Sequence, residues 1–184
     1  MTQIFFEHEF FGEADRLSRK EQLYLDNNAL PDIMKLVRLH PKTLGTLCKK
    51  IVSNILHMLP KRGRMDFDGF YYKPNKTTLR IKVKISCYWS SGRRYGWKWQ
   101  HIKHPDDGLH DVLILVGVGF RDITYFVISN NLQNEMTNNN VVKLQGPNRK
   151  DISQNYWVDE DSVTSYCEPI KSEVDLINTL NQIN

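Results

Sequence analysis

The chain lacks a hydrophobic run long enough to cross a membrane. Its longest apolar stretch is Val112 to Val118, whereas a transmembrane helix needs about 18 apolar residues. Residues Met1 to Phe11 carry Glu7 and Glu9 and lack the positively charged start of a signal peptide. Cysteine is scarce, and the three that occur have neither metal-ligand spacing nor the pattern of a disulfide framework. We therefore expect a cytoplasmic protein with no membrane partner.

Acidic residues are almost missing from one long tract, Ile33 to Pro105. Asp66 and Asp68 are its only acids among 21 in the chain. The same tract holds 17 of the 25 basic residues: Lys35, Arg38, Lys42, Lys49, Lys50, Lys61, Arg62, Arg64, Lys73, Lys76, Arg80, Lys82, Lys84, Arg93, Arg94, Lys98 and Lys103. This segregation indicates a face that binds a polyanion. A solvated basic surface with no partner is the alternative.

The chain also lacks internal repeats and an obvious linker, so its 184 residues predict one domain, 1–184. We place the core at about 41–129, with an N-terminal helical segment over 1–40 and a C-terminal extension over 130–184. Helices are expected over Glu13 to Leu25, Pro31 to His40 and Pro41 to Leu59, and from Ser172 onward.

Strands are expected at Phe67 to Tyr72 and Leu79 to Tyr88, which form a hairpin around Lys73-Pro74-Asn75-Lys76. The apolar run Asp111 to Val118 predicts a strand buried on both faces, and Ile123 to Ser129 another. These elements predict an α/β (α+β) domain with a mixed sheet.

Three further segments are harder to assign. We expect Trp89 to Pro105 to be partly helical, Asn130 to Asn140 to be a loop, and a short strand to lie near Val141 to Leu144.

Asp66, Asp68 and Lys84 are the residues that first suggest chemistry. Two carboxylates in a basic tract can be plain partners of Arg62 or Arg64, or they can ligate a divalent ion beside a phosphate. The hairpin places the polar face of the second strand, with Lys84, near Asp68. A lysine there can orient water or stabilise negative charge, or it can simply face solvent.

The order Asp68, turn, then Arg80-Ile81-Lys82-Val83-Lys84-Ile85-Ser86 resembles the PD-(D/E)xK nuclease motif. Trp97-Lys98-Trp99-Gln100-His101-Ile102, followed by Asp111 to Val118, also looks like the pattern of small restriction endonucleases. The resemblance covers about Pro41 to Ser129. It implies a restriction-endonuclease-like mixed β-sheet flanked by helices, with Asp68 as a metal ligand for Mg²⁺ and Asp68, Lys84 and Gln100 as catalytic residues. Asp66 is our second candidate metal ligand.

The chain departs from this family at Lys82, because the motif has an acidic metal ligand at that position. A cation there replaces attraction for the metal by repulsion, worth about 4 kcal/mol per unit-charge contact at an effective dielectric of about 20. Lys82 is then an inactivating substitution, or it marks a nuclease fold that binds DNA without cutting it. Alternatively, another carboxylate supplies the missing oxygen: Asp66, Glu13, Glu21 or Asp111.

The segment Tyr88 to His104 interleaves aromatic and basic residues and is our candidate for DNA contact. Its aromatic residues can equally be core, and we expect at least one of Trp97 and Trp99 to be buried. The predicted DNA-binding residues are Arg93, Arg94, Lys98, Lys103, Ser86 and Ser91.

Taken with the resemblance, these features predict an Mg²⁺-dependent type II restriction endonuclease that cleaves double-stranded DNA as a homodimer, with Lys82 lowering or abolishing activity. A non-catalytic DNA-binding module on the same fold is the alternative. Two further hypotheses are a protein whose basic face binds an acidic protein and a nuclease that acts on RNA.

Overall fold

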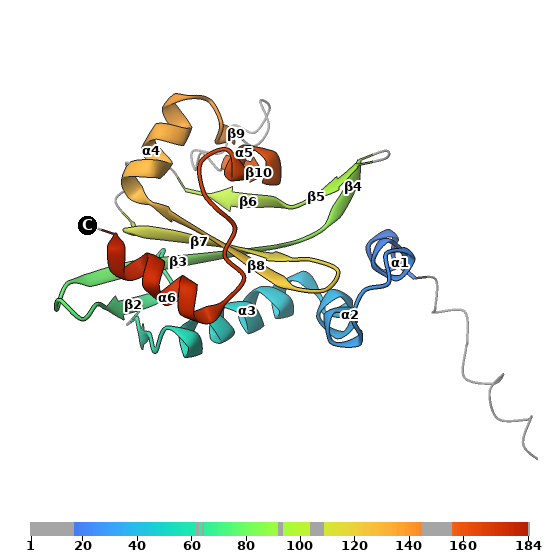
Figure 1. Ribbon diagram of the computed structural model, residues 1–184, viewed down its shortest axis with the longest axis horizontal. Coiled ribbons are helices and arrows are strands. Elements are labelled where there is room, and N and C mark those ends of the chain that lie inside the picture. The colour runs from blue at the N-terminus through green and yellow to red at the C-terminus, as the bar shows by residue number, and fades with distance from the viewer. Residues whose placement is uncertain are drawn as a thin grey trace, which may run out of the picture.

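The computed structural model describes residues 17–61, 63, 65–91, 94–103, 109–144 and 156–183. Its centre is a five-stranded mixed sheet in the order β1-β2-β3-β7-β8 (Figure 1). The strands are β1 (Leu59–Pro60), β2 (Gly69–Tyr72), β3 (Thr78–Cys87), β7 (Val112–Val118) and β8 (Ile123–Ser129). Only β3 and β7 pair in parallel, and the other neighbours are antiparallel. The domain is therefore a mixed α/β structure built on a mixed sheet, as the sequence predicted.

Burial along the strands explains their sequence patterns. Every residue of β7 is buried, because both faces of the sheet are covered there. Strand β3 alternates instead: Leu79, Ile81 and Val83 face a core, while Lys82 and Lys84 face the other side and are half-buried. The hairpin of β2 and β3, and the strands β7 and β8, are confirmed.

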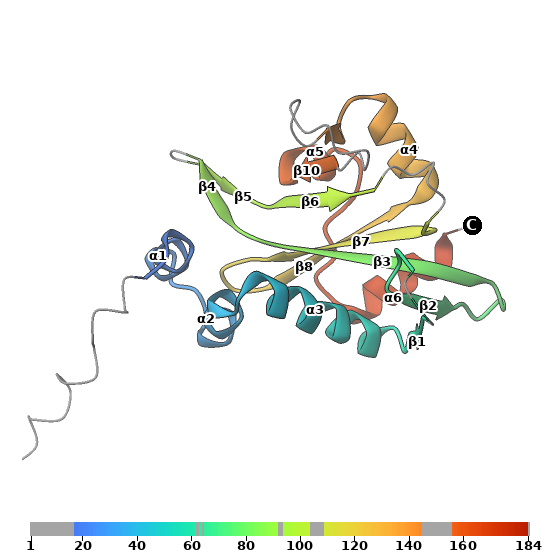
Figure 2. The same cartoon turned by 180° about the vertical axis from the view of Figure 1, so that it is seen from behind.

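Two helices cover one face of this sheet, namely α3 (Pro41–Ile55) and α6 (Glu173–Gln182). Figures 1 and 2 show both on the same side. Val52 and Leu56 from the α3 end, together with Leu176 and Leu180 from α6, pack on the apolar side chains of β3, β7 and β8. The helix predicted over Pro41 to Leu59 is too long: it ends at Ile55, and His57 adopts a positive φ of 47°. Leu59 then begins β1.

A second, three-stranded sheet lies over the other face, in the order β6-β10-β9. Its strands are β6 (Lys98–Ile102), β9 (Lys143–Leu144) and β10 (Tyr156–Asp159), and the helices beside it are α4 (Asn130–Asn138) and α5 (Glu160–Thr164). Trp97 and Trp99 are both buried, and their indole N–H groups donate to the carbonyls of Val118 (3.1 Å) and Val116 (2.9 Å). The sheets are therefore joined by a core of large aromatic side chains.

Between β3 and β6 the chain forms a two-stranded ribbon of β4 (Trp89–Ser91) and β5 (Arg94–Gly96). In Figures 1 and 2 this ribbon projects from one end of the molecule, above α1 (Arg19–Asp26) and α2 (Pro31–Arg38). The prediction of helix within Trp89 to Pro105 is wrong, because alternation of buried tryptophans with Lys98 makes β6 a strand. Residues 92–93 and 104–105 lie outside the described residues.

The Asn-rich segment Asn130 to Asn140 is mostly the helix α4, so the loop prediction is also wrong. Ser129 caps the helix, its hydroxyl accepting from the Leu132 N–H at 3.3 Å. Buried Met136 and Gln133 fix α4 against the sheet. The helices beginning at Pro31 and after Ser172 are confirmed, as is a short strand at Lys143–Leu144. No helix in the described parts of the chain is long and apolar enough to cross a membrane.

Candidate functional site

Asp68 stands immediately before β2, and its carboxylate continues the hydrogen bonding of the sheet past the end of that strand. Its backbone N–H donates to the Ile81 carbonyl at 2.7 Å. Oδ2 accepts from the Val83 N–H at 2.8 Å, and Oδ1 lies 2.9 Å from Lys49 Nζ on α3. The side chain is only 10% exposed. Both carboxylate oxygens are therefore already engaged by the protein.

Lys82 and Lys84 lie beside Asp68 on β3, where their register partners on β7 are Leu113 and Leu115. Both are half-buried, and neither amine has a hydrogen bond or ion pair with a described residue. Burial lowers the pKa of Lys84 to about 8, assisted by the positive charges of Lys82 and Lys49 and opposed by Asp68. Burial likewise lowers the pKa of Lys82. Two partly desolvated amines that no described carboxylate contacts are costly for folding and typical of functional sites.

Five lysines share this region and are called here the lysine cluster: Lys49, Lys61, Lys82, Lys84 and Lys103. They come from α3, from the segment after β1, from β3 and from the end of β6, and each affects the titration of Lys82 or Lys84. Among the described acids, Asp68 and the exposed Asp66 act to raise the pKa of Lys82. The cluster thus carries excess positive charge over a partly buried surface, which suits an anion.

The expected magnesium ligands do not fit a metal centre in this arrangement. Asp68 is held by Lys49 and Val83, and the motif's acidic position is Lys82. Asp111 is not free to complete a site, since Arg80 binds its Oδ1 at 2.7 Å through Nη2 and its Oδ2 at 3.1 Å through Nε. Burial tends to raise the pKa of Asp111, but the hydrogen bonds from Arg80 outweigh it and lower that pKa.

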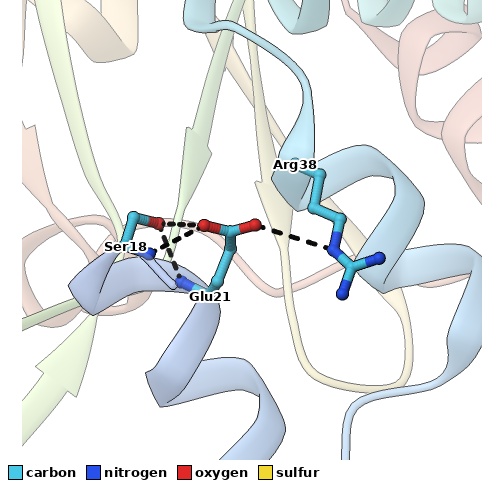
Figure 3. Close-up of polar contacts among 3 residues, drawn as sticks. All are labelled: Ser18, Glu21 and Arg38. Atoms are coloured by element: carbon cyan, nitrogen blue, oxygen red, sulfur yellow. Dashed lines mark hydrogen bonds and ion pairs between the residues drawn. The ribbon is translucent and has the colours of Figure 1, made fainter. Parts of the chain in front are cut away.

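The remaining candidate carboxylates do not complete a metal site. Glu21 closes the capping box of α1 with Ser18 and lies 3.6 Å from Arg38 Nε (Figure 3). Glu13 lies outside the described residues. Within the described parts of the chain, no three His, Cys, Asp or Glu side chains are grouped so that they could hold a metal ion. Magnesium binding therefore stays a prediction that these donors do not support.

Gln100, predicted from the family resemblance, is exposed on β6. The pairing of β6 with β10 shifts register here, since Trp99 faces Val158 while Ile102 faces Tyr156. His101 takes a positive φ of 56° in this bulge, so both Gln100 and His101 are exposed. Gln100 lies on a strand rather than on a helix.

The predicted DNA-binding residues divide into three groups. Lys98 Nζ lies 3.9 Å from the Trp157 ring centre and 5.6 Å from that of Trp89, a cation–π arrangement on the second sheet. The Ser86 hydroxyl accepts from the Lys98 N–H at 3.0 Å, so it joins β3 to β6. Lys103 belongs to the lysine cluster.

Two more of them, Ser91 and Arg94, lie on the ribbon. Ser91 and Arg94 are paired across β4 and β5, and only their backbone is described. Arg93 lies outside the described residues. The ribbon also carries two exposed aromatic side chains, Trp89 (43% exposed) and Tyr95 (49% exposed).

Sequence reasoning missed two features near these residues. His110 is buried and lies 3.0 Å from the Gln133 side chain, whose amide donates to the Lys103 carbonyl at 2.8 Å. These contacts hold the backbone of Lys103 in place. The only signal for them in the sequence is that the polar residue His110 stands next to the apolar run of β7.

The second missed feature is a pocket of about 460 Å³ between α1, the start of α3 and the β3–β4 strands. Arg19 and Lys20 line it together with Cys87 and Trp89. It lies in the part of the fold where the ribbon begins, and no spacing in the sequence indicates it.

Comparison of the chain with protein-family models, with curated proteins and with solved structures found no match. The chemistry of the site is therefore inferred from the residues themselves.

Proposed function

We propose that this chain binds the phosphate backbone of double-stranded DNA through the lysine cluster. The observation that supports it is the pair of half-buried amines of Lys82 and Lys84, which have no hydrogen bond or ion pair with a described residue and have Lys49, Lys61 and Lys103 nearby. A phosphate would supply the direct ion pair that no described carboxylate makes with these two amines, and release of its counterions favours binding.

The test is fluorescence anisotropy with a labelled duplex, with Lys82→Gln as the variant. We expect a loss of about five- to tenfold in affinity, because one phosphate contact is removed. Lys35→Gln is the matched control, since Lys35 on α2 is highly exposed and pairs with Asp32 outside the cluster. Equal losses in both variants would show that net charge alone drives binding. Absence of binding at moderate salt would favour an acidic protein as the partner instead.

Asp68 offers a second test with the opposite sign. Asp68→Asn keeps an acceptor for the Val83 N–H but removes the charge beside Lys49. A phosphate-binding site then becomes more positive, and we expect DNA to bind about two- to fivefold more tightly. Weaker binding of Asp68→Asn would count against the lysine cluster as the phosphate site.

A second candidate function is the Mg²⁺-dependent endonuclease implied by the family resemblance. The order of α3, β2, β3 and a parallel β7 favours it, as does the placing of Asp68 beside Lys82 and Lys84. Cleavage of both strands by one site per subunit would need a homodimer. Plasmid DNA incubated with Mg²⁺ tests this: discrete fragments from Lys82→Glu, but not from this chain, would establish a nuclease blocked at Lys82. No fragments from either protein would leave binding as the function.

A further inference from the structure

The pocket of about 460 Å³ beside β3 and β4 borders the edge of β3 rather than one of its faces. Six consecutive residues line it, Ile85 to Ser90. A pocket on the face of a sheet would be lined by alternate residues of the strand, because successive side chains point to opposite faces. We call this hollow the edge pocket, and its other walls come from α1 and the start of α3: Arg19, Lys20, Leu23, Pro41 and Leu44.

The strand edge that borders this pocket is open. Hydrogen-bonding directions alternate along a strand. Arg80 directs its backbone N–H to Asp111 beside β7, whereas Val83 directs its N–H to Asp68 on the opposite side. Ile85 has the same parity as Val83, so its N–H and C=O point away from β7. Strand β2 pairs with only the first four residues of β3, and no other described strand pairs with this edge. Ile85 thus presents a backbone donor and acceptor that no described strand uses.

The walls of the edge pocket are apolar and its rim is positively charged. Leu23 and Leu44 contribute aliphatic side chains, and Trp89 contributes an aromatic ring that is 43% exposed. Arg19 and Lys20 come from the first turn of α1, and neither makes an ion pair with a described residue. The volume lies in the range of small-molecule sites, about 300–1,000 Å³. This lining suits a flat ligand with apolar faces, polar atoms in its plane and an anionic group.

We propose that the edge pocket binds a nucleotide, whose base hydrogen-bonds to the backbone of Ile85 and whose phosphate contacts Arg19 and Lys20. A base such as adenine carries an amino donor beside a ring-nitrogen acceptor, and this pair matches one free C=O and one free N–H. Its two faces would lie against apolar side chains and the Trp89 ring. The edge pocket contains no member of the lysine cluster, so the inference goes beyond the proposed function and does not require it.

Two sources offer this chemistry, namely a free mononucleotide and an extrahelical nucleotide of bound DNA. Lys84 directly precedes Ile85 on β3, so a single strand connects the lysine cluster with the edge pocket. DNA held by its phosphates at the cluster would therefore bring an unstacked base close to the pocket. A free mononucleotide presents the same base and phosphate without the duplex.

Isothermal titration calorimetry with AMP tests the free form. Ribose 5-phosphate, which lacks the base, is the matched control ligand. We expect AMP to saturate one site per chain and ribose 5-phosphate to bind at least about tenfold more weakly. Fluorescence anisotropy tests the DNA form, by comparing a duplex that carries one extrahelical adenine with the same duplex fully paired. A preference of at least about fivefold for the extrahelical adenine is expected if DNA is the source. Specific binding of either form supports the site, and the form that binds identifies the source.

Two variants place the binding in the edge pocket. Leu23→Trp fills the pocket and should weaken binding of the nucleotide at least about tenfold. Lys20→Gln removes one rim charge and should weaken it about fivefold. Lys35→Gln is the control and should leave it unchanged, because Lys35 pairs with Asp32 on α2. Thermal denaturation checks that each variant is folded. If Leu23→Trp is not folded, the comparison of Lys20→Gln with Lys35→Gln decides.

Three results would overturn the proposal. Equal affinity for AMP and ribose 5-phosphate would show that the base is not recognised. Binding that neither Leu23→Trp nor Lys20→Gln weakens would place the nucleotide elsewhere. If neither AMP nor the extrahelical adenine is bound, an extended peptide strand becomes the candidate for the open edge of β3. The affinity for the fully paired duplex, measured alongside, tests the proposed function separately.

Discussion

At the residue scale, the amine of Lys84 lowers the stability of the folded protein at neutral pH because it is partly buried. Its folded-state pKa of about 8 lies below the ordinary value of 10.5. Below about pH 8 the folded protein must hold a partly desolvated ammonium, whereas the unfolded chain holds the same charge in water. The position is therefore destabilising at neutral pH, which is common for groups that serve function.

Replacing Lys84 with Met should raise the free energy of unfolding by about 1–3 kcal/mol near pH 7. Between about pH 8 and 10.5 the folded state loses its proton before the unfolded state does, so this chain gains stability as pH rises. The advantage of Lys84→Met should therefore shrink near pH 10. Urea denaturation at both pH values measures it, with exposed Lys35→Met as control. A variant that is less stable than this chain at neutral pH would contradict the cost assigned to Lys84.

Asp68 and Asp111 show what residue-level reasoning from sequence can and cannot find. The hairpin of β2 and β3 correctly brought Asp68 near Lys82 and Lys84, because strand pairing follows from alternation and the turn residues. The use of Asp111 by Arg80 could not be predicted, since it depends on the parallel register of β3 and β7. The presence of Lys49 and Lys103 in the lysine cluster could not be predicted either, because it depends on how α3 and β6 pack on the sheet.

At the element scale, Trp97, the residue before β6, lies so close to β7 that one glycine is required. A Cβ added at Gly117 would come within 2.5 Å of the Trp97 ring. Gly45 in α3 is the opposite case, because nothing lies within 4 Å of an added Cβ there. The two glycines therefore make a matched pair for one substitution.

We expect Gly117→Ala to destabilise the fold by about 1–3 kcal/mol, since Trp97 is fixed by its bond to the Val118 carbonyl and must shift. Gly45→Ala should stabilise it by about 0.5–1 kcal/mol through helix propensity. Thermal denaturation measures both. Similar, small effects from the two substitutions would mean that Trp97 is less closely packed on β7 than described.

The ribbon of β4 and β5 is the element whose shape suits duplex DNA, because a two-stranded ribbon fits the major groove. Trp89→Ala should weaken duplex binding by about 1 kcal/mol, roughly fivefold in Kd, through lost aromatic contact. Tyr72→Ala is the control, since Tyr72 is 55% exposed and pairs with Thr78 at the other end of β3. Equal effects of the two substitutions on anisotropy titrations would remove the ribbon from the binding surface.

Strands with strong sequence signals were predicted well, and short or polar elements were not. The apolar runs of β7 and β8 admit few alternatives. Strand β10 has four residues and α5 has five, so neither has a recognisable period. Helix α4 is specified by contacts of Met136 and Gln133 with distant segments, which an Asn-rich sequence does not reveal.

At the scale of the whole molecule, the separation of charge predicts how binding responds to salt. The lysine cluster should release one counterion per phosphate contacted, so log K against log salt should fall with a slope of about −3 to −5. Exchange of Mg²⁺ for EDTA at matched ionic strength should leave the affinity unchanged. Titrations over a range of salt concentrations check both, and a flat dependence on salt would exclude phosphate contacts as the main source of affinity.

The outer edge of β8 has a consequence for self-association. Tyr125 exchanges both backbone hydrogen bonds with Ile170, at 2.8 and 2.9 Å, in an isolated bridge beside that edge. An apolar edge strand with open N–H and C=O groups is a template for aggregation. The segment between α5 and α6 thus covers part of this edge. Proline at position 170 lacks the N–H that bonds to Tyr125, so Ile170→Pro would expose the edge to pairing with a second copy of the chain.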